Sequence, residues 1–350
     1  MNERHLQPNA ERRSGLQHAA IGLVALAAIA TVAVVALAAT TWIGATFPGF
    51  FVLENGVVAS IGRPGWPASR TGIYQNVITE IDDTAVETGS AVYKRVASQP
   101  AGTTFTYNVE NTNAHRRVTL ASRVLTPTDY WMIFGGYFAT GLLYLLLALL
   151  GVTLSIDPQL GRALVLVGSA GGAYALSAVG IYGPDAPIRL HAAIEALFPA
   201  SLVCLALVFP RPLAQITKPA TALAWTLSLA LALPYQLMLD QPAAYSALHS
   251  ACELYLGLAG IAVVTRLVVG ATIGATRTVA PPSALTGAVL GLGAPAIIFL
   301  VSGLTGGRLP VNMCTATAFV FPLCAAHGII REHVAARRTA QATLEVATAD

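Results

Sequence analysis

Charged side chains are scarce in this chain. Asp, Glu, Lys and Arg make up 11% of its 350 residues, whereas an average soluble domain carries about 25%. Hydrophobic residues make up 55%, so the composition excludes an ordinary soluble domain and favours a membrane protein. The formal net charge of +3 is too small to indicate a nucleic-acid partner.

Cysteine is rare, and catalytic motifs are missing. The four cysteines, Cys204, Cys252, Cys314 and Cys324, all lie inside apolar runs without a CxxC or Cys/His spacing, which predicts apolar packing residues and no metal or heme cofactor. The sequence has no His-Glu-x-x-His of a zinc protease, no P-loop and no nucleophile elbow. Gly168-Ser169-Ala170-Gly171 differs in order from the Gly-x-Ser-Gly of rhomboid proteases. We therefore expect no enzymatic active site.

Long apolar runs dominate what is present. A helix needs about 20 apolar residues to cross a bilayer, and runs of this kind predict eight spans at 18–45, 130–154, 161–182, 190–209, 219–239, 246–268, 284–304 and 310–331. The first run is longer than the core of a signal peptide, so we expect an uncleaved signal anchor at 18–45. Cleavage after the small residues near Ala38–Thr40 is the alternative.

The basic residues predict the orientation of these spans, because cytoplasmic loops are enriched in Lys and Arg. With the N-terminus in the cytoplasm, the short outer loops carry only Arg189 and Arg308. The inner segments carry Arg4, Arg12, Arg13, Arg162, Arg211, Lys218, Arg266, Arg277, Arg331, Arg337 and Arg338. The pattern predicts a multi-pass protein of the plasma or inner membrane. In this predicted layout the N-terminus (1–17) and a helical tail (332–350) lie in the cytoplasm, a seven-helix membrane domain spans 130–331, and residues 48–127 lie outside the cell membrane.

Residues 48–127 differ in character from the rest and predict a folded α+β domain. Short alternating stretches favour strands at 50–53, 56–61, 77–81, 104–109 and 117–121. One helical turn is expected at 68–73, closed by Gly72. An amphipathic helix is expected at 88–99, with Val92, Tyr93 and Val96 facing inward.

This order resembles a bacterial PDZ domain. The resemblance rests on Gly65-Trp66-Pro67-Ala68, on Thr71-Gly72-Ile73, on Val77–Asp83 and on Gln99–Thr103. It implies a peptide-binding groove between 50–53 and 88–99, near the lipid surface, with ligand-binding residues Gly49, Phe50, Phe51 and Val52. A rigid spacer without a ligand is the alternative. Gln75-Asn76 replaces the usual Gly-Asp, which predicts a non-standard turn.

Two further pairs place ionisable groups within apolar runs, where such groups tend to be functional or paired. His191 and Glu195 lie one helical turn apart, as do His249 and Glu253. We expect both pairs to face one outward-open cavity that binds a small amphipathic ligand or responds to pH. Hydration by lipid headgroups is the alternative. Gly168/Gly172 and Gly287/Gly291 have the spacing that allows close helix contact.

The C-terminal stretch 320–333 (Val-Phe-Pro-Leu-Cys-Ala-Ala-His-Gly-Ile-Ile-Arg-Glu-His) resembles the end of the last membrane helix in bacterial multi-span sensor proteins. The whole layout is similar to sensor histidine kinases with an extracytoplasmic PDZ-like domain, such as competence-pheromone receptor kinases. After Arg331 only 19 residues remain, so a kinase transmitter is not expected. The resemblance implies a sensor or receptor module with a cytoplasmic signalling partner, and a homodimer is a further option. The rival hypotheses are a transporter or channel, and an intramembrane protease or adaptor that presents peptides.

Overall fold

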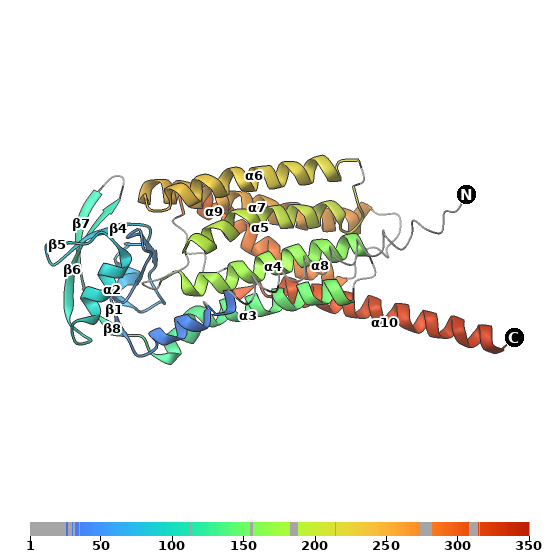
Figure 1. Ribbon diagram of the computed structural model, residues 1–350, viewed down its shortest axis with the longest axis horizontal. Helices are drawn as coiled ribbons and strands as arrows, with labels where there is room; N and C mark the ends of the chain where they lie inside the picture. Colours follow the sequence, from blue (N-terminus) through green and yellow to red (C-terminus); the bar gives the residue numbers. More distant parts are fainter. Residues whose placement is uncertain are drawn as a thin grey trace, which may run out of the picture.

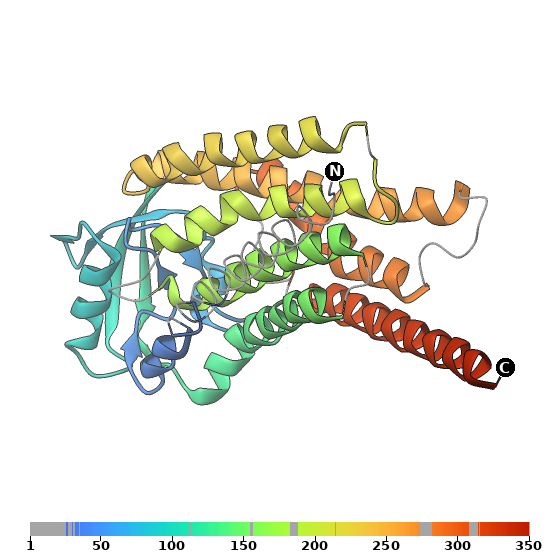
Figure 2. The ribbon, with the colours of Figure 1, turned by 45° about the vertical axis from the view of Figure 1, so that its right-hand side comes forward.

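The computed structural model describes residues 26, 30, 32–34, 36–111, 114–154, 157–182, 188–213, 215–273, 282–307, 314 and 316–349. Figure 1 shows a helix bundle with a mixed α+β domain at one end. The last helix, α10 (Val320–Ala349), extends past the bundle at the opposite end in Figures 1 and 2. The predicted N-terminal segment 1–17, and residues 18–25 of the predicted anchor, lie outside the described residues.

Six helices in the described part of the chain are long and apolar enough to cross a membrane. They are α3 (Pro127–Thr153), α4 (Pro158–Gly180), α5 (Ile188–Val208), α6 (Thr217–Met238), α7 (Pro242–Ile273) and a compound helix made of α8 (Pro282–Ala288), η4 (Val289–Gly293) and α9 (Ala294–Leu304). Many of their large apolar side chains, including Leu142, Leu223 and Ile297, are exposed. This is the architecture of a multi-pass helical membrane protein.

The first and last predicted spans differ from this set. The described part of the first is a shorter apolar helix, Val32–Trp42, whose last turn is η2 (Ala39–Trp42). The last was predicted at 310–331, but its helix begins at Val320 and continues to Ala349. Residues Cys314, Ala316 and Thr317–Phe319 form turns before it. The apolar part of α10 is therefore shorter than predicted, and it continues directly into the tail.

Glycines allow the helices to approach closely, as their spacing predicted. A Cβ added to Gly168 would lie 2.5 Å from the Tyr144 carbonyl oxygen, so the α3 and α4 backbones are nearly in contact. A Cβ on Gly291 would lie 2.1 Å from the Phe321 nitrogen, which places the first turn of α10 against η4. The role predicted for these glycines in helix packing is confirmed.

The domain between η2 and α3 contains three small antiparallel sheets and one helix. Its elements are β1 (Thr46–Phe47), β2 (Phe51–Val52), β3 (Val58–Ser60), η3 (Pro67–Arg70), β4 (Val77–Ile81), β5 (Thr84–Ala85), α2 (Gly89–Ala97), β6 (Thr104–Asn111), β7 (Ala114–Ala121) and β8 (Arg123–Val124). The sheets have the orders β1-β8, β2-β3 and β5-β4-β6-β7. The predicted strand at 77–81 and the hairpin after residue 104 are confirmed. The helix predicted at 88–99 is α2, which begins one residue later and ends two residues earlier than predicted.

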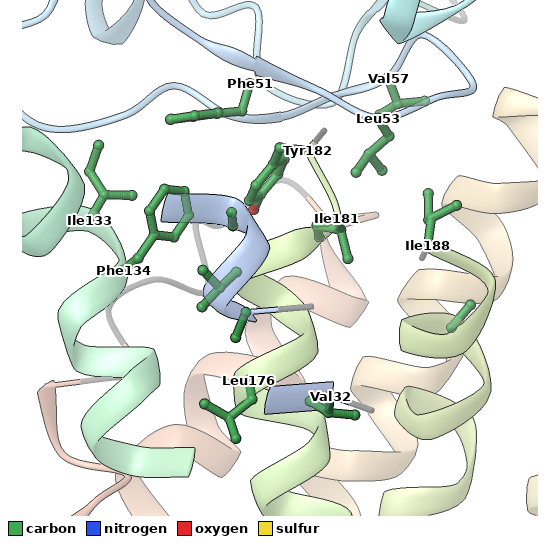
Figure 3. Packing of buried hydrophobic residues seen from close by; sticks show 14 of the residues in the cluster. Val32, Phe51, Leu53, Val57, Ile133, Phe134, Leu176, Ile181, Tyr182 and Ile188 are labelled. Carbon is green, nitrogen blue, oxygen red and sulfur yellow. The ribbon is translucent and has the colours of Figure 1, made fainter. Parts of the chain in front are cut away.

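Two apolar layers hold this domain. One is its own core, where Val92 and Val96 of α2 pack with residues of the sheets, including Phe50, Ile81, Phe105 and Tyr107. The other joins the domain to the bundle. In Figure 3, Phe51, Leu53 and Val57 of the domain lie over Phe134, Ile181 and Tyr182 at the ends of α3 and α4. Alternation along β2 explains the division, because successive side chains of a strand point to opposite faces.

Polar contacts add to this interface. Arg63 Nε lies 2.9 Å from Asp129 Oδ1, and Asp129 belongs to the capping box that begins α3. The Asn55 side-chain amide donates to the Leu239 carbonyl oxygen, 2.9 Å away, at the end of α6. The domain is thus attached to the bundle at several separate helix ends.

Candidate functional sites

Three ionisable side chains from α5 and α7 meet inside the bundle. His249 Nδ1 lies 2.8 Å from Glu195 Oε1, and His249 Nε2 lies 3.4 Å from Glu253 Oε1. We call Glu195, His249 and Glu253 the Glu–His–Glu cluster. Both carboxylates are about 1% exposed, so the cluster is closed to the surroundings.

Neighbouring side chains complete the cluster. The Tyr235 hydroxyl of α6 donates to Glu195 Oε2 at 2.9 Å. The Tyr245 ring lies parallel to the His249 ring, with centroids 5.6 Å apart and 7° between the planes. Glu195 therefore has a partner on each oxygen, which lowers the free energy of burying its charge.

Of the two predicted pairs, Glu195, His249 and Glu253 come together, and His191 lies apart from that cluster. The 70 Å³ cavity between the bundle helices is lined by aromatic and small residues, and the four predicted side chains are not part of that lining. His191 is linked to α4 instead: its Nδ1 lies 2.7 Å from Ser177 Oγ, and its ring stacks on Tyr174. The outward-open cavity therefore stays a prediction, while the described side chains of Glu195, His249 and Glu253 pack against one another.

The chemistry of the cluster follows from its hydrogen-bonding groups. A neutral imidazole offers one N–H donor and an imidazolium offers two, so carboxylates facing both ring nitrogens fit a protonated His249 between them. The same two contacts leave no ring nitrogen for a metal. Across the described residues, no group of three or more His, Cys, Asp and Glu side chains has a metal-binding arrangement.

The inserted domain reaches this cluster through its non-standard turn. Gln75 has a φ of +59°, in the left-handed region that a non-glycine residue rarely adopts. A Cβ added to Gly307 would lie 3.4 Å from His249 Cδ2 and 3.8 Å from Gln75 Cδ. The side chains of Gln75 and His249 therefore both lie close to Gly307. Burial, with a smaller contribution from the Glu253 and Glu195 carboxylates, raises the pKa of the Tyr74 hydroxyl far above its ordinary value.

A second site lies where the domain meets the bundle. A cavity of about 680 Å³ lies between α2 and the ends of the membrane helices, with β1 beside it. Its lining includes large aromatic and aliphatic side chains, Trp42, Phe47, Phe51, Tyr93, Leu125 and Tyr182. The volume is in the range of about 300–1,000 Å³ that small-molecule sites occupy.

Only Phe51 of the four predicted groove residues lines this cavity. Phe50 and Val52 are buried in the domain core, and Gly49 lies against Arg123 with a φ of +85°. The β2 edge is also occupied. The Val52 N–H donates to the Tyr93 hydroxyl at 2.8 Å, and that hydroxyl donates to the Val52 carbonyl oxygen at 3.2 Å. Gly49, Phe50 and Val52 therefore do not line this cavity, and their role in ligand binding stays a prediction.

Sequence reasoning missed three polar partners: Tyr235, Ser177 and the Tyr93 hydroxyl. The sequence placed Tyr93 on the inward face of its helix but not at the strand edge. Tyr235 follows Pro234 inside an apolar run. A hydroxyl group in such a run indicates that it has a buried polar partner, and this signal could have pointed to Tyr235.

Comparison with protein-family models, with curated proteins and with solved structures gave no match to this chain.

Proposed function

We propose that this chain is a signal-sensing module of the cell membrane, in which an extracytoplasmic PDZ-like domain and an eight-helix bundle act on a cytoplasmic output partner. Segment 18–45 and the apolar first part of α10 supply the two spans beyond the six apolar helices, and both termini face the cytoplasm. The bundle has two arrangements, and a ligand bound to the domain favours one of them. The position of α10 differs between the two arrangements, and the partner responds to that position.

The observation that carries this proposal is the proximity of the domain to the Glu–His–Glu cluster. A Cβ added to Gly307 would lie within 4 Å of both Gln75 Cδ of the domain and His249 Cδ2 of α7. A buried charged cluster is sensitive to small displacements, because a carboxylate that loses its partner stays in a medium of low dielectric constant. A shift of the turn at Gln75 therefore changes the free energy of the bundle.

The position of α10 supports an output at the other end. Its first turn packs on η4 at Gly291, and its second half extends beyond the bundle, away from the domain (Figures 1 and 2). Residues Arg331–Val334 and Arg337–Ala340 are mostly exposed. A helix anchored in the bundle and exposed beyond it is suited to binding a partner that responds to its position.

The strand and helix order supports the PDZ-like assignment. A strand, a short helical turn, a strand, a longer helix and a final hairpin follow one another between β2 and β7. The cavity of about 680 Å³ lies beside α2, on the side where the resemblance implies the groove. The transporter and protease hypotheses gain no comparable support, since the ionisable side chains are packed against one another and do not line the bundle cavity.

The proposal is tested by following α10 while the domain contact is changed. Hydrogen–deuterium exchange of residues 320–349 is measured on the full chain in nanodiscs for the wild type, Gln75→Ala and the control Arg117→Ala. Arg117 forms an exposed ion pair with Asp83 on the far sheet, so its loss should leave α10 unchanged. We expect Gln75→Ala to change exchange in α10 by at least threefold. Equal exchange in all three proteins would contradict the coupling.

The output partner is tested in native membranes. The full chain and a chain ending at Arg331 are purified after cross-linking, and captured proteins are identified by mass spectrometry. We expect the full chain alone to capture a protein with a kinase, phosphatase or cyclase domain, and Gln75→Ala to change its yield. If no such protein depends on the tail, the receptor proposal is wrong.

A further inference from the structure

We propose that the cavity between α2 and the bundle binds one acyl chain of an anionic phospholipid drawn from the surrounding membrane. The inference deepens the proposed function, on which it rests for its role as an input signal: the ligand of the sensing domain is a membrane lipid. The lining of the cavity, its position, its occupied strand edge and its charge support the binding itself.

The lining of the cavity suits a hydrocarbon chain. Aromatic rings surround it on the bundle side, where Trp42 and Phe47 each lie close to Phe51, with ring centroids 6.3 Å and 5.4 Å apart. Small residues of α2, including Ala91 and Ala97, form the opposite wall. An apolar chain that leaves the bilayer for this cavity keeps its surface away from water.

The position of the cavity connects it to the membrane. Three lining residues lie at helix ends. Trp42 is the last residue of η2, Leu125 comes directly before the N-cap residue of α3, and Tyr182 follows the end of α4. These ends mark the level at which the apolar helices stop, and Trp and Tyr favour that interface. A lipid tail can therefore enter from the bilayer without crossing water.

A peptide strand fits this site less well. Strand addition needs free N–H and C=O groups on the receiving edge. On β2, the Tyr93 hydroxyl already bonds the Val52 N–H and carbonyl oxygen, while the opposite edge pairs with β3. A peptide would have to break two hydrogen bonds before forming its own, and an acyl chain needs none.

The charge at the cavity favours an anionic headgroup. Of the described residues that line it, Lys94 alone carries a charge. Lys94 is exposed and forms no ion pair with another described residue. The hydroxyls of Thr46 and Thr88 add hydrogen-bond donors to the same lining, whereas the Thr41 hydroxyl donates to the Ala38 carbonyl oxygen. A phosphate at the entrance would find both charge and donors there.

The test uses the full chain in nanodiscs that contain phosphatidylglycerol with a photoactivatable diazirine in one acyl chain, or phosphatidylcholine with the same chain. Adducts are mapped by mass spectrometry. For the wild type, we expect labelling of residues 41–51 and 88–97, at least threefold stronger with the anionic lipid. Ala91→Trp fills the cavity and should reduce this labelling at least tenfold. Lys94→Glu should remove the preference for the anionic lipid.

Matched controls use the neighbouring exposed position. Arg95 belongs to α2 but does not line the cavity, so Arg95→Trp and Arg95→Glu should label as the wild type does. Melting curves of all variants check that they are folded. Equal labelling of Ala91→Trp and Arg95→Trp would overturn the proposal. So would displacement of the probe by peptides with apolar C-termini, which indicates a peptide site, or by free fatty acid alone.

This result is separable from the proposed function. Labelling requires no output partner, and exchange in α10 requires no lipid probe. If labelling fails while Gln75→Ala still changes α10, the lipid proposal is wrong and the receptor proposal stands. If labelling succeeds while α10 does not respond, the cavity is a lipid site without the proposed coupling.

Discussion

Replacing His249 with alanine tests whether the Glu–His–Glu cluster is a single electrostatic unit. The substitution removes the group that lies 2.8 Å from Glu195 and 3.4 Å from Glu253. Glu195 keeps the hydrogen bond from Tyr235. Both carboxylates are about 1% exposed in the wild type, so the substitution leaves two buried acidic groups near each other without the imidazole that faced both.

The size of the effect follows from that burial. Removing one partner of a buried ion pair costs about 3–5 kcal/mol, because the remaining charge is not compensated. A domain of about 150–250 residues loses about 2–4 °C of melting temperature per kcal/mol. We therefore expect His249→Ala to lower the apparent melting temperature of the bundle by about 6–20 °C.

A triple variant separates charge from packing. In Glu195→Gln/His249→Ala/Glu253→Gln the two amides have nearly the shape of the carboxylates but no charge, so most of the lost stability should return. His327→Ala is the control, since His327 is an exposed histidine on α10, and surface substitutions usually change stability by about 0.5 kcal/mol or less. All proteins are melted in one detergent at one scan rate, because irreversible unfolding makes the midpoint depend on that rate.

Two outcomes contradict this reasoning. If His249→Ala melts with the wild type, the contacts of the histidine contribute nothing to stability. If the triple variant melts as low as the single one, the loss comes from the cavity left by the ring and from its stacking on Tyr245, and not from uncompensated charge.

Three further predictions concern the domain and the packing of α10. Trp66→Ala removes a fully buried ring at the domain–bundle interface and should destabilise the domain by about 3–5 kcal/mol, measured by hydrogen exchange in β2–β4. Gly291→Val places side-chain atoms where a Cβ alone would be 2.1 Å from the Phe321 nitrogen, so it should displace α10 and raise exchange in its first turns. Burial raises the pKa of Tyr93 above its ordinary value, so the folded domain keeps a proton that the unfolded chain releases. Stability should be level below about pH 10 and fall above it. Tyr93→Phe should flatten that fall and, by freeing the Val52 backbone groups, lower stability by about 1–3 kcal/mol, as melting curves across this pH range would show.

Local pattern predicted much of the fold. The strand at 77–81 alternates and is bounded by turn residues, and the helix near 88–99 carries its apolar positions one turn apart, so both were found. Six apolar runs were found because a span of about 20 residues is a long signal. The α10 start was not found, since the apolar residues before Val320 look the same in sequence whether they form turns or helix.

The candidate sites depend on contacts that a linear pattern does not contain. The pairs His191/Glu195 and His249/Glu253 were visible as ionisable groups in apolar runs. That Glu195 turns to His249 while His191 turns to Ser177 depends on how α4, α5 and α7 pack. Similarly, the resemblance to a binding domain implied an open strand edge, and only the structure reveals the Tyr93 hydroxyl on it.

The turn at which the sequence departs from the PDZ resemblance is also one of the places where the domain approaches the bundle. Gln75-Asn76 replaces a Gly-Asp turn, and Gln75 adopts a backbone conformation that favours glycine. Such a residue is retained only where the surroundings fix it. Here Gln75 N donates to the Val58 carbonyl oxygen, and the side chain reaches Gly307 beside His249. A glycine would relieve the backbone but remove the side chain that lies near Gly307. The strained turn is therefore best explained by the contact it makes, which is why Gln75→Ala is the substitution on which the proposed coupling depends.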